Sequence, residues 1–161
     1  METRAETDGM TGLYNKSKYM DMVTNTYAKE EKVAVIFWDI NFLKKINDTR
    51  GHEAGDALII SVAESIQNIS NKTDRGYRIG GDEFIMVMRG AGEEETMQKI
   101  YEWERSIEVL QTGVDIPISV SMGYAFGKGS DLEQIIHQAD QMMYENKRMA
   151  HKMAENETDK K

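Results

Sequence analysis

The longest unbroken apolar run in the chain is VAVIFW, at residues 33–38, and it is closed by Asp39 and Ile40. Continuous hydrophobicity of this length, ended by an acid, is typical of a strand that is buried on both faces of a sheet. We therefore expect residues 33–40 to form the central strand. No run of 18 apolar residues occurs in the sequence, so the pattern predicts no membrane-spanning helix.

Four segments space their apolar residues as amphipathic helices do. The spacing predicts a first helix within residues 13–30, a second within 52–69 and a third across about 93–111. A last helix should follow Ser130 and Glu133, which together form a capping-box pattern. Each apolar stripe is of the kind that packs against a sheet.

Two further segments indicate strands. In ISVSMGYAF, residues 118–126, large apolar residues alternate with Ser119, Ser121 and Gly123, so one face of the predicted strand is unusually small. We expect another element to pack closely against that face. In RGYRIGGDEFIMVM, residues 75–88, two apolar runs flank a glycine pair, which predicts a β-hairpin.

The predicted order is helix, strand, helix, hairpin, helix, strand, helix. This order favours an α/β (α+β) sandwich, in which helices cover a central mixed or antiparallel sheet. The length of 161 residues fits one domain. We expect a linker remnant at residues 1–12, the domain at 13–152 and a solvated tail at 153–161.

The net charge of −8 argues against a polymeric nucleic acid as partner, because affinity for its backbone depends on Lys and Arg. A small anionic ligand stays compatible with this charge, since a few local cations or a metal can attract it. The chain has no cysteine and no N-terminal signal pattern. We therefore expect a cytoplasmic protein without direct membrane contact, which could still be the cytosolic part of a membrane-anchored sensor.

Two adjacent acids, Asp82 and Glu83, stand at the tip of the predicted hairpin. Two like charges about 4 Å apart repel by roughly 4 kcal/mol at an effective dielectric near 20, so gathered acids usually have a cation or a proton between them. Asp39 can join the pair if the hairpin lies beside the central strand, and an oxygen-only cluster of this kind suits Mg²⁺ or Mn²⁺. The alternative is a polar hairpin tip without any ligand.

Polar residues after the central strand could recognise a nucleotide. Asn47 and Asp56 could bind a base edge, because a carboxylate accepts hydrogen bonds from guanine and an amide both donates and accepts. Turn and cap chemistry is the simpler explanation for both. Lys44 could meet a phosphate, and Lys147 could instead complement the negative end of the last helix. No Walker-type phosphate loop is present.

Taken together, these segments resemble the GGDEF family of diguanylate cyclases. Four separated motifs carry the resemblance in order: DGMTGLYNKSKY at 8–19, DINFLKKINDTRGHEAGDAL at 39–58, RIGGDEF at 78–84 and ADQMMYENK at 139–147. The resemblance implies the palm-like sandwich of class III nucleotide cyclases. It also implies a reaction in which two GTP molecules form cyclic di-GMP and release two pyrophosphates.

The resemblance assigns roles to individual residues. It implies that Asp82 and Glu83 are catalytic, with Asp82 as the base for the 3′-hydroxyl. The metal ligands it implies are Asp39, the carbonyl of Ile40, Asp82 and Glu83. Asn47 and Asp56 would bind guanine. The groups that would contact phosphates are Lys44, Lys147 and the backbone at Phe42 and Leu43.

The family also implies partners. Each protomer of an antiparallel homodimer presents one GTP, so a single domain supplies only half of a reaction site. Family members usually carry a sensory or dimerising module on the N-terminal side, and we expect one in the full-length protein.

Three positions depart from the family pattern. Asn41 stands where a second aspartate is common, and His151 stands where many members have an arginine that contacts phosphate. Asn71 replaces the arginine of the Arg-x-x-Asp product-inhibition site, whose aspartate is Asp74. Asn41 should cost little, because the first acid, Asp39, is intact. The change at Asn71 predicts weak feedback inhibition. His151 leaves open a catalytically weak GTP-binding module that regulates a partner.

Overall fold

Strand β1 (Val33–Ile40) lies at the centre of a four-stranded sheet, as its continuous hydrophobicity predicts. The computed structural model describes residues 5–159. The strand order is β2-β3-β1-β4, and every neighbouring pair is antiparallel. The other strands are β2 (Asp74–Arg78), β3 (Glu83–Arg89) and β4 (Val120–Gly127).

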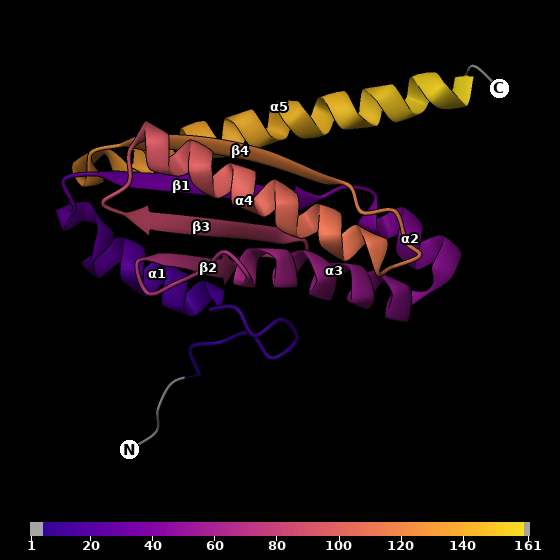
Figure 1. Ribbon diagram of the computed structural model, residues 1–161, viewed down its shortest axis with the longest axis horizontal. Coiled ribbons are helices and arrows are strands. Elements are labelled where there is room, and N and C mark those ends of the chain that lie inside the picture. Colours follow the sequence, from indigo (N-terminus) through magenta and orange to yellow (C-terminus); the bar gives the residue numbers. More distant parts are fainter. Residues whose placement is uncertain (1–4, 160–161) are drawn as a thin grey trace.

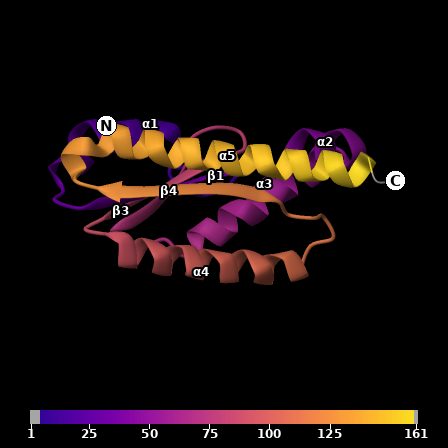
Figure 2. The same ribbon diagram turned by 90° about the horizontal axis from the view of Figure 1, so that it is seen from above.

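Helices cover both faces of this sheet, so the molecule has three layers (Figures 1 and 2). One face packs against α3 (His52–Gln67) and α4 (Glu93–Thr112), and the other packs against α1 (Lys16–Asn25) and α5 (Leu132–Asp159). Side chains of β1 alternate between two hydrophobic cores, which explains why all eight of its residues are buried. The predicted sandwich is confirmed, and its sheet is antiparallel.

Helix α2 (Leu43–Arg50) is missing from the order that the sequence predicts. It begins directly after β1, and the residue before it, Phe42, has a left-handed backbone with φ 63°. Only Ile46 of this helix is buried. A helix with one buried apolar position has no apolar stripe, so hydrophobic periodicity could not reveal it.

Helix α5 packs against the face of β4 that carries small side chains, which confirms the expected close contact at that face. A Cβ atom at Gly123 would lie 2.1 Å from the carbonyl oxygen of Ala139 and 2.3 Å from the backbone nitrogen of Met143. Such distances leave room only for glycine, so the backbones of β4 and α5 approach each other directly. This contact fixes how α5 runs across the sheet.

The two ends of the described chain differ in structure. Residues 5–12, expected as a linker remnant, include a bridge from Thr7 to Tyr14 and an ion pair from Asp8 to Arg78. At the other end, α5 continues to Asp159. Two short 3₁₀ turns, η1 (Tyr27–Lys29) and η2 (Gly129–Asp131), connect helices to strands. Within residues 5–159, none of the helices has the length and apolar character to cross a membrane.

Candidate active site

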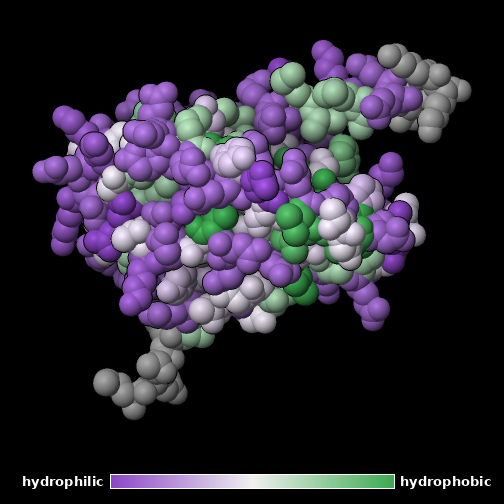
Figure 3. Space-filling view, in the orientation of Figure 1, coloured by the Kyte–Doolittle hydropathy of each residue, from purple (hydrophilic) through white to green (hydrophobic). Residues whose placement is uncertain are grey.

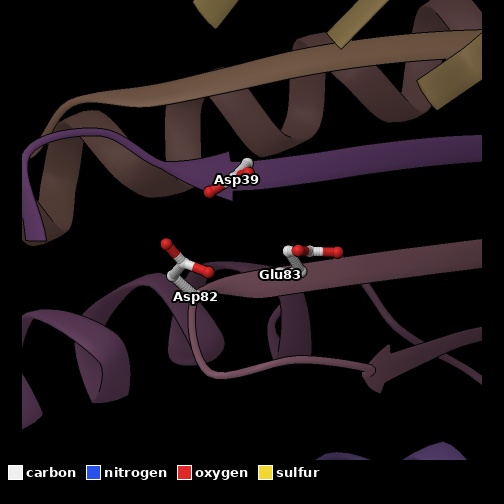
Figure 4. Close-up of side chains that lie close together, drawn as sticks. All are labelled: Asp39, Asp82 and Glu83. Carbon is white, nitrogen blue, oxygen red and sulfur yellow. The ribbon is translucent and has the colours of Figure 1, made fainter. Parts of the chain in front are cut away.

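Three carboxylates meet where β1 ends and β3 begins (Figure 4). Asp39 is paired in register with Glu83, and the backbone nitrogen of Ile40 donates a hydrogen bond of 3.0 Å to the carbonyl oxygen of Asp82. One oxygen from each of the three side chains lies within 4.8 Å of the others. The antiparallel pairing of the hairpin with β1 therefore gathers acids that are more than 40 residues apart in sequence.

Burial and mutual repulsion shape the ionisation of this acidic cluster, which consists of Asp39, Asp82 and Glu83. The side chain of Asp39 is 12% exposed, and burial raises its pKa to about 6. The charges of Asp82 and Glu83 add to the increase, while Lys147 lowers this pKa and offsets part of it. Burial also raises the pKa of Glu83, followed by the charges of Asp82 and Asp140. A cation among these oxygens would stabilise the charged carboxylates and so lower the pKa of Asp39 and of Glu83.

Lys147 of α5 reaches the cluster from the helical layer. Its Nζ donates to Asp39 Oδ1 at 3.0 Å, to the carbonyl oxygen of Ile40 at 2.9 Å and to Asn41 Oδ1 at 3.3 Å. The alternative that Lys147 only complements the end of its helix is therefore wrong. Asp39 and Ile40 are also two of the expected metal ligands, so Lys147 lies at the edge of the expected metal site.

The donor set fits a hard divalent cation. The cluster offers carboxylate oxygens and a backbone carbonyl without a sulfur or imidazole ligand, which suits Mg²⁺ and Mn²⁺. Mg²⁺ usually takes one or two protein carboxylates and completes its shell with water and substrate phosphates. One buried and two partly buried acids with one nearby ammonium leave negative charge for such an ion to neutralise.

The expected phosphate contacts surround the N-terminus of α2. Phe42 and Leu43 are half-buried there, and Lys44 is exposed. The first backbone N–H groups of a helix have no partner within the helix, so they favour an anion. The ring of Phe42 packs against His151 of α5 with 4.7 Å between the ring centroids. His151 thus contacts the residue that precedes α2.

The guanine candidates occupy two consecutive helices. Asn47 lies in α2 and is half-buried, and Asp56 is exposed in α3. Gly55 provides space for Asn47, because a Cβ atom at Gly55 would lie 1.7 Å from Asn47 Oδ1. The helices therefore hold the Asn47 amide against the start of α3, close in sequence to Asp56.

Asn71 and Asp74, at the expected position of the family's product-inhibition site, both contact other residues of this chain. Asp74 forms an ion pair of 3.0 Å with Lys99 of α4, whose Nζ also donates to the carbonyl oxygen of Ile69. The Oδ1 atom of Asn71 accepts from the backbone nitrogens of Thr73 and Asp74, at 2.9 and 2.8 Å. Both side chains thus stabilise the turn before β2.

Sequence reasoning missed two sets of contacts around the site. Arg78 donates to both oxygens of Asp8, at 3.3 and 3.1 Å, and to the carbonyl oxygen of Gly81 at 2.8 Å. Burial raises the pKa of Asp8, but hydrogen bonds from Thr11 and Arg78 outweigh that effect and lower it overall. Arg78 therefore ties the hairpin tip to the N-terminal segment.

The second missed set joins Asn41 to Ser119 and Ser121. Two serines that interrupt an otherwise apolar strand at 118–126 were a signal for it. Their partner could not be inferred, since Asn41 lies almost 80 residues away.

Comparison with known proteins agrees with this geometry. The family described as "Diguanylate cyclase, GGDEF domain" matches residues 5–153. The chain therefore belongs to the GGDEF family, whose members share the cyclase palm fold and generally use divalent metal ions.

Relatives with assigned names include two diguanylate cyclases. Diguanylate cyclase A of Treponema denticola is 30% identical over 154 residues, which cover 88% of this chain and 41% of that protein. DgcS of Shewanella oneidensis is 30% identical over 155 residues, which cover 91% of this chain and 51% of that protein. The chain thus spans about half the length of these relatives, or less.

Solved structures include a GGDEF domain with the same arrangement. The GGDEF domain of DgcB from Caulobacter crescentus, determined in complex with c-di-GMP, has a TM-score of 0.78 and 26% sequence identity. The alignment covers 93% of this chain and 92% of that one.

Proposed function

We propose that this domain condenses two GTP molecules into cyclic di-GMP and releases two pyrophosphates. The observation that carries the proposal is the convergence of Asp39, Asp82 and Glu83 at the end of β1, within a chain of the GGDEF family. The acids lie beside Lys147 and the N-terminus of α2, which are suited to phosphates. Each protomer of a homodimer contributes one GTP and one half-site.

The metal site would consist of Asp39, the carbonyl of Ile40, Asp82 and Glu83. A bound Mg²⁺ or Mn²⁺ would supply charge neutralisation for the phosphates. Asp82 takes the proton of the 3′-hydroxyl, and that oxygen forms a bond to the α-phosphorus of the other GTP. The bond from this phosphorus to the oxygen that bridges to the β-phosphate breaks, and pyrophosphate leaves. Lys44, Lys147 and the backbone at Phe42 and Leu43 hold the phosphates.

Base choice rests on Asn47 and Asp56. The Asp56 carboxylate accepts from the N1 and N2 donors of guanine, whereas N1 of adenine is an acceptor and would face it without a hydrogen. The domain should therefore use GTP and leave ATP unreacted. Incubation with both nucleotides and Mg²⁺, followed by chromatography, checks this choice; mixed cyclic dinucleotides would contradict it.

A GTP-binding module with little catalysis is the competing function. His151 favours it, because an imidazole packed on Phe42 does not offer a phosphate the permanent two-pronged contact of arginine. The chromatographic assay separates the two functions. Cyclic di-GMP in the product supports the cyclase, while bound but unreacted GTP at high protein concentration supports the module.

Feedback inhibition should be weak. The Asp74 carboxylate is paired with Lys99, and Asn71 lacks the guanidinium that would grip the product's phosphates. Titration with cyclic di-GMP, followed by calorimetry, should detect no tight site that depends on Asp74. Tight binding that is abolished by Asp74→Ala would refute the prediction.

Since the chain covers only part of its relatives, we also propose that the full-length protein carries a sensory or dimerising module on the N-terminal side.

A further inference from the structure

Asn41 follows β1 and is buried, with 3% of the residue exposed. Its Nδ2 donates to Ser119 Oγ at 3.0 Å, and its Oδ1 accepts from Ser121 Oγ at 3.0 Å. Its backbone nitrogen donates to the carbonyl oxygen of Ser119 at 2.8 Å. Each end of the amide thus has a matching partner, so these bonds fix its orientation.

The fixed Oδ1 atom of Asn41 faces the ammonium of Lys147, at 3.3 Å from Nζ. The same ammonium donates to Asp39 Oδ1 and to the carbonyl oxygen of Ile40. An ammonium has three donor hydrogens, so these three acceptors satisfy all of them. A long, flexible lysine side chain is thereby held in one position at the edge of the acidic cluster.

We propose that Asn41, oriented by Ser119 and Ser121, is a positioning residue that holds the Lys147 ammonium beside Asp39. The inference deepens the proposed function and rests on it, because Lys147 is there a phosphate contact. Asn41 itself touches neither substrate nor metal in this account. It acts only through Lys147.

The neutral amide provides an acceptor at this position without adding negative charge to the cluster. The cluster already contains Asp39, Asp82 and Glu83, and burial and repulsion raise the pKa of two of these acids. An aspartate at position 41 would add a fourth negative charge and would compete with Asp39 for Lys147. The amide instead offers an acceptor without that charge, so Lys147 stays close while its charge remains available to a phosphate.

The hydroxyl group of the buried residue Ser121 holds the Asn41 amide and is itself satisfied by that bond. It is paired in register with Asp39 across the sheet, on the face that α5 covers. Its hydroxyl has an accepting atom within reach at Asn41, so a polar group with 0% exposure is satisfied there. Replacing Ser121 by alanine removes the donor to Oδ1, so the amide is then oriented only by its bonds to Ser119 and Lys147 and holds the ammonium less firmly.

The direct test is hydrogen exchange of the Lys147 ammonium, followed by nitrogen-15 NMR in metal-free and nucleotide-free protein. The resonance is assigned by its loss in Lys147→Met. Asn41→Leu and Ser121→Ala should each accelerate exchange by roughly fivefold, the equivalent of one net hydrogen bond. Asn41→Asp keeps an acceptor and should preserve the slow exchange. Ser17→Ala, an exposed serine on α1, is the matched control.

Thermal unfolding of each variant establishes that the fold is kept, and Ser121→Ala provides the milder change if Asn41→Leu does not fold. A wild-type ammonium that exchanges as fast as those of exposed lysines would overturn the inference. So would an exchange rate that is unchanged in Ser121→Ala.

GTP affinity, measured by calorimetry with Mg²⁺, gives the second measurement. Ser121→Ala should weaken GTP binding by roughly fivefold, the loss expected for one net hydrogen bond, and Ser17→Ala should leave it unchanged. If the wild type bound no GTP, the proposed function would fail while the NMR result still decided the position of Lys147. If GTP bound equally well to wild type and Ser121→Ala, the inference would fail while the proposed function stood.

Discussion

At the scale of single residues, Asp39 shows that bringing the three acids together costs folding free energy. Its carboxylate is buried beside two other acids, and Lys147 compensates for part of this cost. The pKa is raised to about 6, compared with 3.8 for an unperturbed aspartate. Folding therefore opposes the charged form of Asp39. Under the proposed function, a divalent cation bound at this cluster would offset that cost.

The raised pKa predicts how stability depends on pH. Between about pH 4 and pH 6 the folded state holds a proton on Asp39 that the unfolded state has lost, so stability falls as pH rises through this window. Above pH 6 the full cost, about 1–3 kcal/mol, is present. Asp39→Asn should therefore stabilise the metal-free protein by this amount at pH 8, and by progressively less as the pH falls toward 4.

Urea unfolding in EDTA at pH 8, 6 and 4.5 measures this difference. Asp48→Asn, at an exposed position of α2, is the control and should show little change. A lower stability of Asp39→Asn than of wild type at pH 8 would show that the bond to Lys147 outweighs burial.

At the scale of elements, the site depends on two close approaches that glycines permit. One lies between α2 and α3, where Gly55 leaves room for Asn47. The other lies between β4 and α5, where Gly123 faces the helix backbone. The two contacts differ in what a methyl group would strike, so the same substitution should have different effects.

Gly55→Ala should keep the fold and impair the ligand site. The new methyl group would displace the Asn47 amide, which is the mobile end of a side chain, while alanine favours helix α3 by up to about 1 kcal/mol. GTP affinity should fall roughly fivefold if Asn47 binds guanine, because about one hydrogen bond is lost. Calorimetry with GTP measures the effect, and Ala57→Ser in the same helix is the control. Unchanged affinity would exclude Asn47 from the guanine site.

Gly123→Ala should destabilise the whole fold. Its methyl group would meet backbone atoms of α5 at 2.1 and 2.3 Å, and these cannot move without shifting the helix. Overpacking of this kind costs about 3 kcal/mol. Gly9→Ala makes the same chemical change where no atom lies within 4 Å, and it should shift stability by less than about 0.5 kcal/mol. Equal unfolding temperatures for the two variants would contradict the packing of β4 on α5.

The elements also show how far the sequence could predict the structure. Continuous or periodic hydrophobicity identified β1, the hairpin and α4 near their observed limits, and the small face of 118–126 anticipated the approach of α5. Helix α2 was missed because it buries a single residue. The meeting of Asp39 with the hairpin acids was foreseen from the chemistry of the strand end.

Two other contacts between distant residues could not be predicted from the sequence. Lys147 and Asp39 lie 108 positions apart, and nothing in the local pattern around either residue specifies the other. The same holds for Asp8 and Arg78, which lie 70 positions apart. Such contacts follow from the crossing of α5 over the sheet and from the fold of the N-terminal segment.

At the scale of the whole molecule, the proposed reaction requires two copies of the domain. Hydrophilic side chains cover most of the face seen in Figure 3, and its hydrophobic patches are small and separated. Each copy also carries a net charge of −8, which opposes the approach of a second copy. Isolated domains should therefore meet weakly, and catalysis should be limited by their encounter.

The most direct measurement is cyclic di-GMP formation from GTP and Mg²⁺ as a function of protein concentration, analysed by chromatography. We predict that product forms and that its rate per protomer rises in proportion to protein concentration in the dilute range. Asp82→Asn should reduce the rate by at least roughly 100-fold, since it removes the base. Absence of cyclic di-GMP at every concentration, with GTP bound, would contradict the proposed activity, and a rate per protomer independent of concentration would contradict paired half-sites.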